Sequence, residues 1–438
     1  MYNYSREPIS LWNKTSDLPQ FSKLSENIKT DVLVIGGGLC GLLTAYRLKE
    51  KGVNCVLVEK ERVMGGVSSN TTAKITAQHG LIYHKLIKNM GEEKAKLYLK
   101  INLEAIDEYE ELSEKFNCDF ERKDNYVYSS ESSEKLQNEM KALRILGYKA
   151  EFERSLPIPL ESFGAVKFPS QAQFHPIKFA KGLARELDIY ENTFVRAVAG
   201  TTVRTDEAEI TAKKIVVATH FPFINNHGLY FMKMYQHRSY VIALRDAAQY
   251  DGMYVDDRKN GMSFKNHGDL LLLGGGDHRT GKKGGNWAEL RSFKNVCYPE
   301  SKEKFFWATQ DCMTLDDVPY IGQYSKNTPD IYVATGFNKW GMTGSMVAAD
   351  LLSDIITEKG TPYKEIFEPL RSMLKPQLFL NGFETAVNFL TPTKKRCPHL
   401  GCALKWNSAE HSWDCPCHGS RFSEKGELLD NPSNGNLF

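Results

Sequence analysis

Residues 31–60, DVLVIGGGLCGLLTAYRLKEKGVNCVLVEK, constrain the fold of this chain more than any other segment. The apolar run 32–35 is typical of a β-strand that is buried on both faces. Three glycines follow it with G-x-G-x-x-G spacing: Gly36, Gly38 and Gly41. In that pattern the first glycine permits a tight turn, the second lets backbone approach a pyrophosphate, and the third lets a helix pack on its strand. The segment therefore predicts a strand, a turn and a helix around a phosphate-binding site.

The residues after the glycines complete this unit. Apolar residues recur at helical spacing after Gly41, and Gly52 marks the end of the predicted helix. A second strand, 55–58, ends in Glu59, about 20 residues after the first glycine, where a carboxylate accepts hydrogen bonds from both ribose hydroxyls. Because strand, turn, helix, strand and acid occur in order, we predict a site for an ADP-containing cofactor rather than a purely structural turn.

The composition excludes several classes of protein. With 56 Lys and Arg against 54 Asp and Glu, the net charge is only +2, so no global field favours nucleic acid or an anionic membrane as a partner. The sequence shows neither an apolar leader nor a run of about eighteen apolar residues. We therefore predict a cytoplasmic protein without a transmembrane segment. The length of 438 residues predicts two or three domains.

Periodicity places further elements along the chain. Residues 1–30 form a predicted irregular arm. The polar, glycine-bounded loop 65–80 follows the second strand where a chain would cross a bound cofactor, and a plain surface loop is the alternative. We place further helices at 92–116, 136–143, 177–187, 343–359 and 377–390, and strands at 190–195, 214–219, 240–244, 269–273 and 330–335.

Several of these segments together resemble the FAD-dependent oxidoreductases of the D-amino-acid oxidase (DAO) family, which includes glycine oxidase and sarcosine oxidase. The resemblance covers roughly residues 10–360. It rests on the glycine motif, the loop GGVSSNTTAK, the segments YENTFV and KIVVATH, and the closing stretch 317–343, where DVPYIG is followed by IYVATGFNKWGMT. It implies FAD as cofactor, a Rossmann-type α/β core of the glutathione-reductase-like DAO type, and an inserted α+β substrate domain.

The resemblance also implies cofactor contacts. In the closing stretch a strand ends at Gly336, and a helix N-terminus at Gly341, Met342 and Thr343 directs free N–H groups at the flavin. Tight packing is the alternative role for the two glycines. Val195 is implied to hold the adenine through its backbone. The remaining implied contacts lie beside the acid and in the crossing loop: Lys60, Gly66, Ser68 and Thr72.

The reaction implied by the family is hydride removal from a C–N bond of an amine or amino acid. Oxidases of the sarcosine type place a lysine for oxygen activation on the strand before a glycine-rich turn, and the matching strand 270–273 contains only leucines. This departure favours a dehydrogenase, although Lys74 in the crossing loop is a candidate for the same role; contact with solvent or a phosphate is its alternative. Arg238, for a substrate carboxylate, and His278 are the other candidate catalytic residues, with solvated charge as the alternative.

Four of the nine cysteines lie in the segment CPHLGCALKWNSAEHSWDCPCHGSRF. Its C-x-H and C-x-x-H pairs resemble a Rieske [2Fe–2S] site, in which two thiolates hold one iron and two imidazoles the other. The likeness also implies a disulfide between Cys402 and Cys417. A tetrahedral zinc site is the alternative for these ligand types. The four matching metal ligands are Cys397, His399, Cys415 and His418.

We therefore divide the chain into an N-terminal arm, a DAO-type domain, a linker helix and a short all-β Rieske module. The predicted function is a dehydrogenase that passes electrons from FAD to the cluster and on to an external acceptor, either a soluble carrier or a quinone. An amine oxidase with a structural cluster, and an electron-transfer or sensor protein without its own small substrate, are the alternatives. The predicted boundaries are 1–30, 31–370, 371–390 and 391–438, with the FAD core at about 31–90, 175–225 and 305–360 and the substrate domain at about 91–174 and 226–304.

Overall fold

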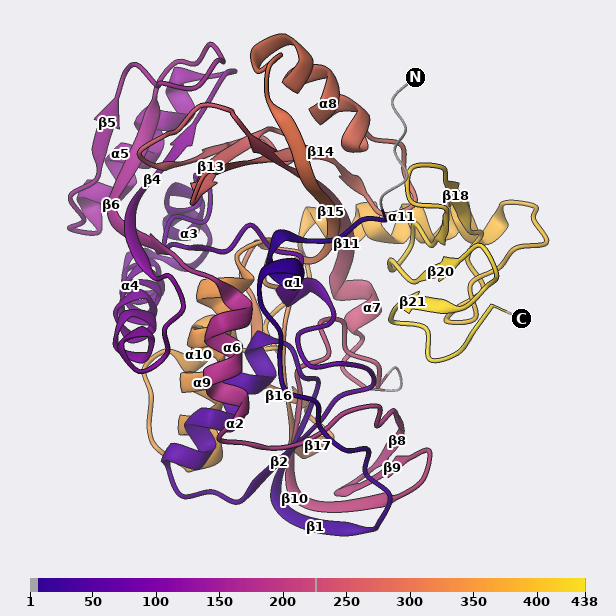
Figure 1. Cartoon of the computed structure of the whole chain (residues 1–438). Helices are drawn as coiled ribbons and strands as arrows, with labels where there is room; N and C mark the ends of the chain where they lie inside the picture. The colour runs from indigo at the N-terminus through magenta and orange to yellow at the C-terminus, as the bar shows by residue number, and fades with distance from the viewer. Residues whose placement is uncertain (1–6, 225–226, 438) are drawn as a thin grey trace.

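The computed structural model describes residues 7–224 and 227–437. Three β-sheets organise this part of the chain: an eight-stranded, a nine-stranded and a four-stranded sheet. Figure 1 shows them in the lower, upper and right-hand parts of the view, and the yellow C-terminal segment forms the smallest one. Among the described helices, none combines the length and apolar character needed to cross a bilayer.

The eight-stranded sheet is built around β1 (Ile28–Ile35), the strand of the glycine motif. β1 pairs in parallel with β2 on one side and β10 on the other, which explains its continuous apolar run. Val32 and Val34 pack in one core with residues of the covering helices, whereas Leu33 and Ile35 join a second core on the opposite face. Across the sheet the strands are β16 (Tyr320–Ser325), β17 (Thr328–Thr335), β10 (Glu209–Val217), β1, β2 (Cys55–Val58) and β7 (Asp188–Tyr190), with β9 (Thr202–Thr205) and β8 (Val195–Ala199) added at β10.

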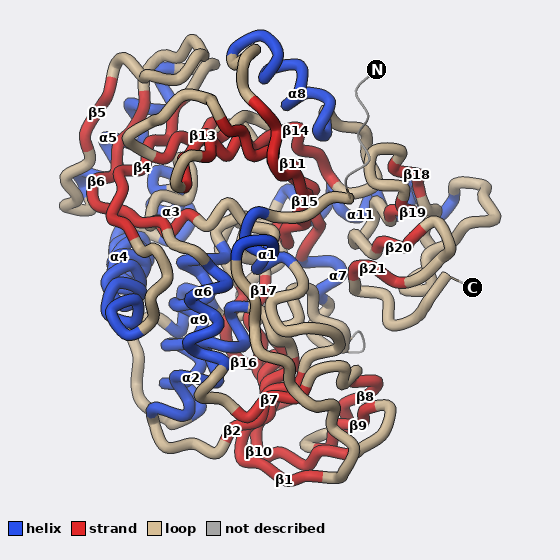
Figure 2. Tube along the Cα trace, in the orientation of Figure 1, coloured by secondary structure: helices blue, strands red, loops and turns tan. Residues whose placement is uncertain are grey.

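Helices cover one face of this sheet. α2 (Leu39–Glu50) begins directly after the glycine turn and packs against α9 (Gly341–Ile356) and α6 (Pro176–Ala184). Figure 2 shows the three helices side by side beside the strands. Gly36 has a φ of +111°, which L side chains rarely adopt, and a Cβ at Gly41 would overlap the carbonyl oxygen of Gly36. These two glycines therefore set the turn and the close approach of α2 to β1.

The nine-stranded sheet forms the upper part of the molecule. Its longest pair is β11 with β15, which are antiparallel along the whole of β11. In order, its strands are β15 (Lys302–Thr314), β11 (Met234–Arg245), β14 (Leu270–Arg279), β13 (Ser263–His267), β12 (Met253–Asp256), β4 (Glu121–Tyr128), β6 (Ala165–Gln173) and β3 (Lys74–Ile75), with β5 (Glu151–Glu153) beside β6. The helices that follow or flank these strands are α3 (Tyr83–Met90), α4 (Glu92–Lys115), α5 (Ser133–Ile145) and α8 (Asn286–Cys297). Shorter helices are α1 (Leu11–Thr15), η1 (Val67–Ser69), α7 (Tyr230–Lys233) and α10 (Lys364–Phe367).

Four assignments made from the sequence differ from the structure. The predicted irregular arm, described from residue 7, contains the helix α1 and the first three residues of β1. The predicted strand 190–195 is a turn, because β7 ends at Tyr190 and β8 begins at Val195. Residues 305–314, assigned to the FAD core, belong to β15 of the nine-stranded sheet, where pairing with β11 holds them. β3, also assigned to the core, pairs with β6 of the same sheet. Hydrophobic periodicity identifies a strand but does not say which sheet it joins.

The C-terminal module, residues 391–437, follows helix α11 (Pro376–Leu390). Its strands form an antiparallel meander with a core that consists mainly of four cysteines, Leu404 and Phe422. Such a small core buries little apolar surface, so the module depends on cofactors and on contacts with the rest of the chain. The four strands are β18 (Lys405–Asn407), β19 (Ser412–Asp414), β20 (Arg421–Ser423) and β21 (Leu428–Asp430).

The close approach at Gly41 gives a first prediction. We expect Gly41→Ala to lower the free energy of unfolding by about 1 to 3 kcal/mol, because the added methyl group overlaps the Gly36 carbonyl and pushes α2 off its strand. The purified variant should also retain less flavin. Chemical denaturation and the flavin absorbance per chain measure the two effects. Gly360→Ala is the matched control, since a Cβ there meets no atom within 4 Å. Equal flavin content in both variants would contradict the prediction.

Candidate active site

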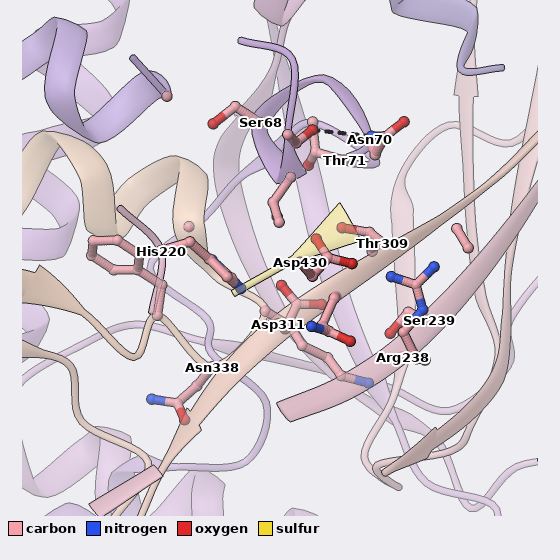
Figure 3. Close-up of a pocket in the computed structure, with 18 of the residues that line it drawn as sticks. Ser68, Asn70, Thr71, His220, Arg238, Ser239, Thr309, Asp311, Asn338 and Asp430 are labelled. Atoms are coloured by element: carbon pink, nitrogen blue, oxygen red, sulfur yellow. Dashed lines mark hydrogen bonds between the residues drawn. The ribbon is translucent and has the colours of Figure 1, made fainter. Parts of the chain in front are cut away.

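A cavity of about 760 Å³ is bounded by residues of all three sheets. Its wall includes the glycine turn, the loop after β2, parts of β11 and β15, the N-terminus of α9 and the end of the C-terminal module. Figure 3 shows Ser68 and Thr71 on one side of it, Arg238 and Asp311 from the nine-stranded sheet, and Asp430 from the C-terminal module. The volume lies in the range of small-molecule sites, about 300 to 1,000 Å³.

Most residues predicted to bind the cofactor line this cavity. The other three support its wall: Gly41 lies against the turn, and Gly336 lies against Thr314. The Thr343 hydroxyl donates to the Thr76 carbonyl oxygen at 2.8 Å and so ties α9 to β3. Direct contact of each residue with the cofactor stays a prediction. The ten lining residues are Gly36, Gly38, Glu59, Lys60, Gly66, Ser68, Thr72, Val195, Gly341 and Met342.

Hydrogen bonds fix the acid and the crossing loop to the glycine turn. Glu59 Oε2 accepts from the Gly37 N–H at 2.7 Å, and Glu59 Oε1 accepts from the Glu61 N–H at 3.0 Å. Burial raises the pKa of Glu59, and these two bonds oppose that effect. Ser68 Oγ accepts from the Leu39 N–H at 3.0 Å, which holds the crossing loop at the first turn of α2. The Glu59 carboxylate and the Ser68 hydroxyl are therefore held at the predicted phosphate-binding turn.

Two features of the cavity wall fit FAD. His220 lines the cavity with a buried Nε2 that has no hydrogen-bond partner among the described residues. Burial lowers the pKa of His220 to about 4, so its ring is neutral at pH 7 and this nitrogen is available to a ligand. The second feature is the N-terminus of α9, which faces the cavity because Gly341 begins this helix and lines the cavity. A helix N-terminus stabilises negative charge, as a reduced flavin requires.

Of the three candidate catalytic residues, Lys74 and Arg238 line the cavity, whereas His278 is not among the lining residues. Lys74 Nζ donates to Thr72 Oγ1 at 3.1 Å and to Ser263 Oγ at 3.5 Å. Burial lowers the pKa of Lys74 to about 7. A second buried lysine, Lys265 on β13, has a pKa well below its ordinary value, first because of burial and then because of the charge on Lys74. The charge on Lys74 therefore adds to burial in disfavouring the ammonium form of Lys265.

Arg238 has a different partner from the one that the sequence suggested. Its Nε donates to Glu410 Oε1 at 3.0 Å, and its Nη2 donates to Glu410 Oε2. The Tyr240 hydroxyl donates to the same carboxylate at 2.9 Å and lies 2.9 Å from His278 Nε2. Arg238 is thus paired with a carboxylate of the protein rather than of a substrate, because the C-terminal module covers this part of the sheet. His278 supports that contact through Tyr240.

Sequence reasoning missed the polar residues that join the module to the cavity. Gln236, Gln310 and Asp311 lie on the paired strands β11 and β15, and Glu410 lies in the turn between β18 and β19. Burial raises the pKa of Asp311, which lines the cavity, to about 6. No motif marks these positions. Only the register of β11 against β15, which the sequence does not supply, places the strand residues beside the module.

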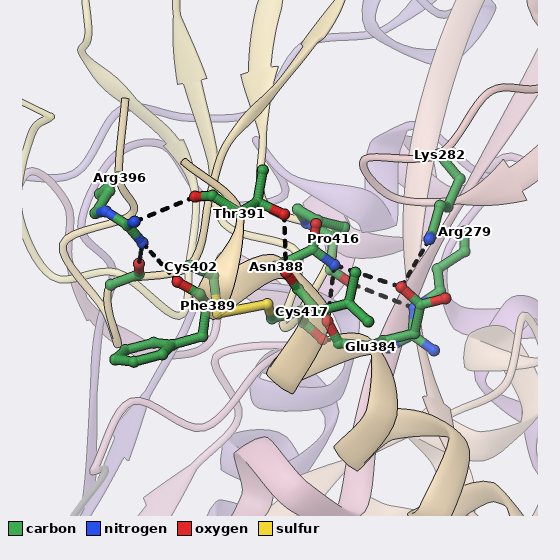
Figure 4. The surroundings of a disulfide bond; sticks show 12 residues. Arg279, Lys282, Glu384, Asn388, Phe389, Thr391, Arg396, Cys402, Pro416 and Cys417 are labelled. Carbon is green, nitrogen blue, oxygen red and sulfur yellow. Dashed lines mark hydrogen bonds and ion pairs between the residues drawn. A yellow bond between two sulfur atoms is a disulfide. The ribbon is translucent and has the colours of Figure 1, made fainter. Parts of the chain in front are cut away.

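Two loops of the C-terminal module, 397–402 and 415–420, carry the predicted iron ligands. The Cys402–Cys417 disulfide joins them, with the two Cα atoms 6.7 Å apart. Figure 4 shows this bond between the end of α11 and Pro416. The sulfur atoms of Cys402, Cys415 and Cys417 all lie within 4.8 Å of one another, and since two of them form the disulfide, Cys415 keeps its thiol for a metal.

The four predicted ligands converge between these loops. The rings of His399 and His418 have centroids 5.0 Å apart, and Cys397 and Cys415 lie in one buried cluster. A hydrogen bond from Cys415 is the main cause that lowers the pKa of Cys397. Burial lowers the pKa of His399 to about 4 and that of His418 to about 3, which keeps both imidazoles in the neutral, ligating form. The buried His418 Nδ1 has no hydrogen-bond partner among the described residues. Two thiols and two neutral imidazoles fit a Rieske cluster.

The loop 415–420 rests directly on the nine-stranded sheet. Gln236 Nε2 donates to the His418 carbonyl oxygen at 2.9 Å, and Gln310 Nε2 donates to the Gly419 carbonyl oxygen at 2.9 Å. Arg279 Nε donates to the Pro416 carbonyl oxygen at 3.2 Å. Side chains of the nine-stranded sheet therefore hold the loop at three backbone carbonyl groups.

A buried ion-pair group holds the module at a second point. Arg421 Nη2 donates to Glu410 Oε2 at 2.8 Å, so the carboxylate of Glu410 lies between Arg421 and Arg238. Burial alone would raise the pKa of Glu410, but the charges of Arg238 and Arg421 outweigh it and hold the pKa at about 2. Glu410 is therefore ionised at pH 7 and satisfied by charged donors from both sides.

Comparison with known families agrees with these two sites. The family described as FAD dependent oxidoreductase, DAO, matches residues 31–355. The chain belongs to the DAO family. The Rieske [2Fe-2S] domain matches residues 386–438. This DAO-family protein is accordingly an oxidoreductase with FAD and a [2Fe–2S] cluster as cofactors. The cavity and the paired cysteine–histidine loops are the candidate sites for these two cofactors.

Relatives share the two-part architecture or its larger part. YhfW of Bacillus subtilis, which carries the provisional name of a Rieske 2Fe-2S iron-sulfur protein, is 34% identical, with 97% of this chain and 96% of YhfW covered. L-proline dehydrogenase from P. horikoshii superposes with a TM-score of 0.66 at 16% identity, over 79% of this chain and 98% of that one. Glycine oxidase from Geobacillus kaustophilus gives 0.65 at 18% identity, over 78% and 99%. The two structures share the fold of the flavoprotein part.

The Glu410 contact predicts a measurable link between module and sheet. We expect Glu410→Gln to lower the free energy of unfolding at pH 7 by about 3 kcal/mol, because the buried Arg238 loses its charged partner and Arg421 loses one of its three carboxylates. A carboxyl whose folded pKa is depressed stabilises the fold above its unfolded pKa, so the difference from wild type should shrink as the pH falls from 4.5 towards 2. Denaturation followed by cluster absorbance checks this. Glu424→Gln, at an exposed position of the same module, is the control; equal stability of the two variants would refute the contact.

Proposed function

We propose that the protein is a dehydrogenase that oxidises a C–N bond of an amine or amino acid and delivers the electrons through its Rieske module to an external acceptor. FAD supplies hydride acceptance, and the cluster supplies one-electron transfer. The position of the loop 415–420 carries the proposal. Gln310 lines the cavity and also donates to the Gly419 carbonyl oxygen, one residue after the ligand His418. One layer of side chains therefore separates the cofactor cavity from the cluster loop.

Carboxylates on the cavity wall support an amine substrate. Asp277 and Asp311 line the cavity from β14 and β15. Asp277 Oδ2 accepts from Lys339, while its buried Oδ1 has no hydrogen-bond partner among the described residues. Acidic groups in a cavity favour a ligand that carries an ammonium group. Two structures with the same fold, L-proline dehydrogenase and glycine oxidase, are named for amino-acid substrates.

Lys74 is the residue we propose to receive the substrate proton. An amine must lose its ammonium proton before a hydride can leave the adjacent carbon, because the nitrogen lone pair must be free. Burial lowers the pKa of Lys74 to about 7, so its Nζ is partly neutral at pH 7 and can take up that proton. Thr72 and Ser263 hold this Nζ at the cavity wall through their hydroxyls.

This role predicts a change in pH dependence. We expect Lys74→Met to lower the rate constant for anaerobic flavin reduction at pH 8 by about a hundredfold. We also expect it to remove the rise of that rate through pH 7, since neutral Lys74 forms above its pKa of about 7. Stopped-flow absorbance across this pH range measures both. Lys283→Met, at an exposed position, controls for loss of a lysine. An unchanged pH profile in Lys74→Met would argue against proton transfer to this residue.

An amine oxidase with a structural cluster is the second candidate. The observation in its favour is Lys265, which lies on β13 directly opposite Leu272 of β14. The strand 270–273 lacks the lysine expected for an oxidase, but Lys265 brings a buried amine next to that strand from its neighbour. Lys74 lies close enough for its charge to lower the pKa of Lys265.

Removal of one iron ligand separates the two candidates. Under anaerobic conditions, substrate should bleach the flavin of wild type and of Cys415→Ser equally. Reduction of an added one-electron acceptor should fall at least about tenfold in Cys415→Ser, because the thiolate of Cys415 is needed to hold the cluster. Cys297→Ser, a half-buried thiol outside the site, is the control. Fast hydrogen peroxide formation that Cys415→Ser leaves intact would establish the oxidase instead. Failure of every amine and amino acid to bleach the flavin would favour an electron-transfer protein.

A further inference from the structure

Helix α11 buries its polar side and exposes its apolar side, the reverse of an ordinary surface helix. Its two fully buried residues are asparagines, Asn381 and Asn388. Asn381 Oδ1 accepts from Arg279 Nη1 at 3.1 Å, and the Asn388 carbonyl oxygen accepts from the Ala403 N–H at 3.0 Å. The polar side of the helix therefore faces the protein. The apolar side faces outward and consists of Phe379, Leu380, Phe383, Val387 and Leu390, which fall within an arc of about 100° at 3.6 residues per turn.

The outward side is an exposed apolar surface of unusual degree. Phe379 is 70% exposed, Phe383 67% and Leu390 77%. α7 packs beside α11 and adds the exposed Met232. Contiguous exposed apolar surface of this kind marks an interaction site, since single scattered side chains are the usual pattern on a protein surface. Further exposed apolar residues in the adjoining segments are Leu229, Leu374, Phe389 and Leu400.

Basic residues flank this apolar face at both ends. Lys375 precedes the helix, and Lys394 and Arg396 follow it. Arg396 Nη1 donates to the Phe389 carbonyl oxygen at 3.0 Å, so its charge is fixed at the C-terminal end of the helix (Figure 4). Within residues 371–396 of the sequence Glu384 is the only acid, and it pairs with Lys282 at 2.7 Å. The face is therefore apolar in the middle and positive at its edges.

We propose that α11 binds the surface of an anionic phospholipid bilayer. The phenylalanine and leucine side chains enter the boundary between headgroups and acyl chains, and the lysines and arginine contact the lipid phosphates. The helix lies in the plane of the surface: 15 residues rise about 23 Å, whereas the hydrocarbon layer is about 30 Å thick. The aromatic side chains suit this depth because they combine apolar area with a position close to the interface.

The charges favour a bilayer over a second copy of the chain. A two-fold symmetric contact along α11 sets the two helices antiparallel or parallel, according to the direction of the axis. Lys375 of one copy would then lie next to Lys394 and Arg396 of the second, or next to its Lys375. Like charges at both ends oppose that contact, whereas anionic headgroups match them.

Binding through α11 also places the iron site with respect to the membrane. The half-buried ligand His399 is followed by Leu400, which is 41% exposed, and Gly401 lies beside the ring of Phe389 on α11. The loop with this histidine is therefore next to the lipid-binding surface, where an acceptor dissolved in the bilayer is within reach. That choice of acceptor rests on the proposed function; lipid binding itself does not, and a vesicle assay tests it without any substrate.

Flotation of the full-length holoprotein with vesicles tests the proposal. We expect wild type to float with vesicles that contain phosphatidylglycerol, and to float less with phosphatidylcholine alone or at high salt. The double variant Phe379→Ser, Phe383→Ser should lower the bound fraction at least about tenfold, since two large apolar side chains are lost. Lys394→Glu should weaken binding to the anionic vesicles. Phe163→Ser, at a phenylalanine that is 55% exposed elsewhere, should bind like wild type.

Measurements on the same samples can also contradict the proposal that α11 binds lipid. Flavin and cluster absorbance show that each variant is folded, because the substituted side chains are exposed. Wild type that stays with the unbound fraction on anionic vesicles would refute lipid binding. A wild type that sediments as a dimer without lipid, with a monomeric Phe379→Ser, Phe383→Ser variant, would make this face a subunit interface instead. Binding that neither salt nor Lys394→Glu changes would contradict the role of the basic flanks.

Discussion

The carboxylate of Glu410 makes the contact on which the arrangement of the two cofactor sites depends. It lies buried between Arg238, on the nine-stranded sheet, and Arg421, in the C-terminal module. The module has few apolar residues to bury, and four cysteines make up most of its core. Its position is therefore set by hydrogen bonds and ion pairs with the flavoprotein rather than by apolar packing.

The tail of the C-terminal module forms part of the wall of the cofactor cavity. Asp430 and Asn431 line the cavity, and Asn431 Nδ2 donates to the Phe221 carbonyl oxygen at 2.7 Å, in the segment that follows β10. Further along the tail, the Ser433 N–H donates to Ser420 Oγ at 3.0 Å. Residues 431–433 thus connect the segment after β10 to the cluster loop. Residues of the docked module, among them Glu410, Arg421 and Asp430, thus form part of the cavity wall.

Local sequence patterns predicted the two cofactor-binding segments, but they did not predict the long-range contacts that join these segments. The glycine motif and the paired cysteine–histidine segments each specify a chemistry within a few tens of residues, so the cavity and the ligand loops were predictable. Arg238 was assigned to a substrate because nothing local connects it to Glu410, which is 172 positions away. The strand β15 was placed in the wrong sheet for the same reason: its pairing with β11 is a long-range choice. The turn that holds Glu410 has no motif at all.

Buried charge at the junction of module and sheet serves orientation. Removing two guanidiniums and a carboxylate from water costs free energy, and apolar residues of similar volume would give at least as much stability. A bidentate arginine–carboxylate contact, however, is met only in one relative orientation, whereas apolar surfaces tolerate sliding. Glu410 accepts hydrogen bonds from Arg238 of the nine-stranded sheet and from Arg421 of the module. Gln236 and Gln310 add directional hydrogen bonds to the loop that carries His418. Electron transfer between two cofactors falls steeply with distance, so a junction that fixes geometry suits it better than one that maximises stability. The polar inner side of α11 follows the same rule, since the Asn381 side chain accepts from Arg279 and the Asn388 backbone carbonyl oxygen accepts from the Ala403 N–H, which leaves the apolar residues on the outside.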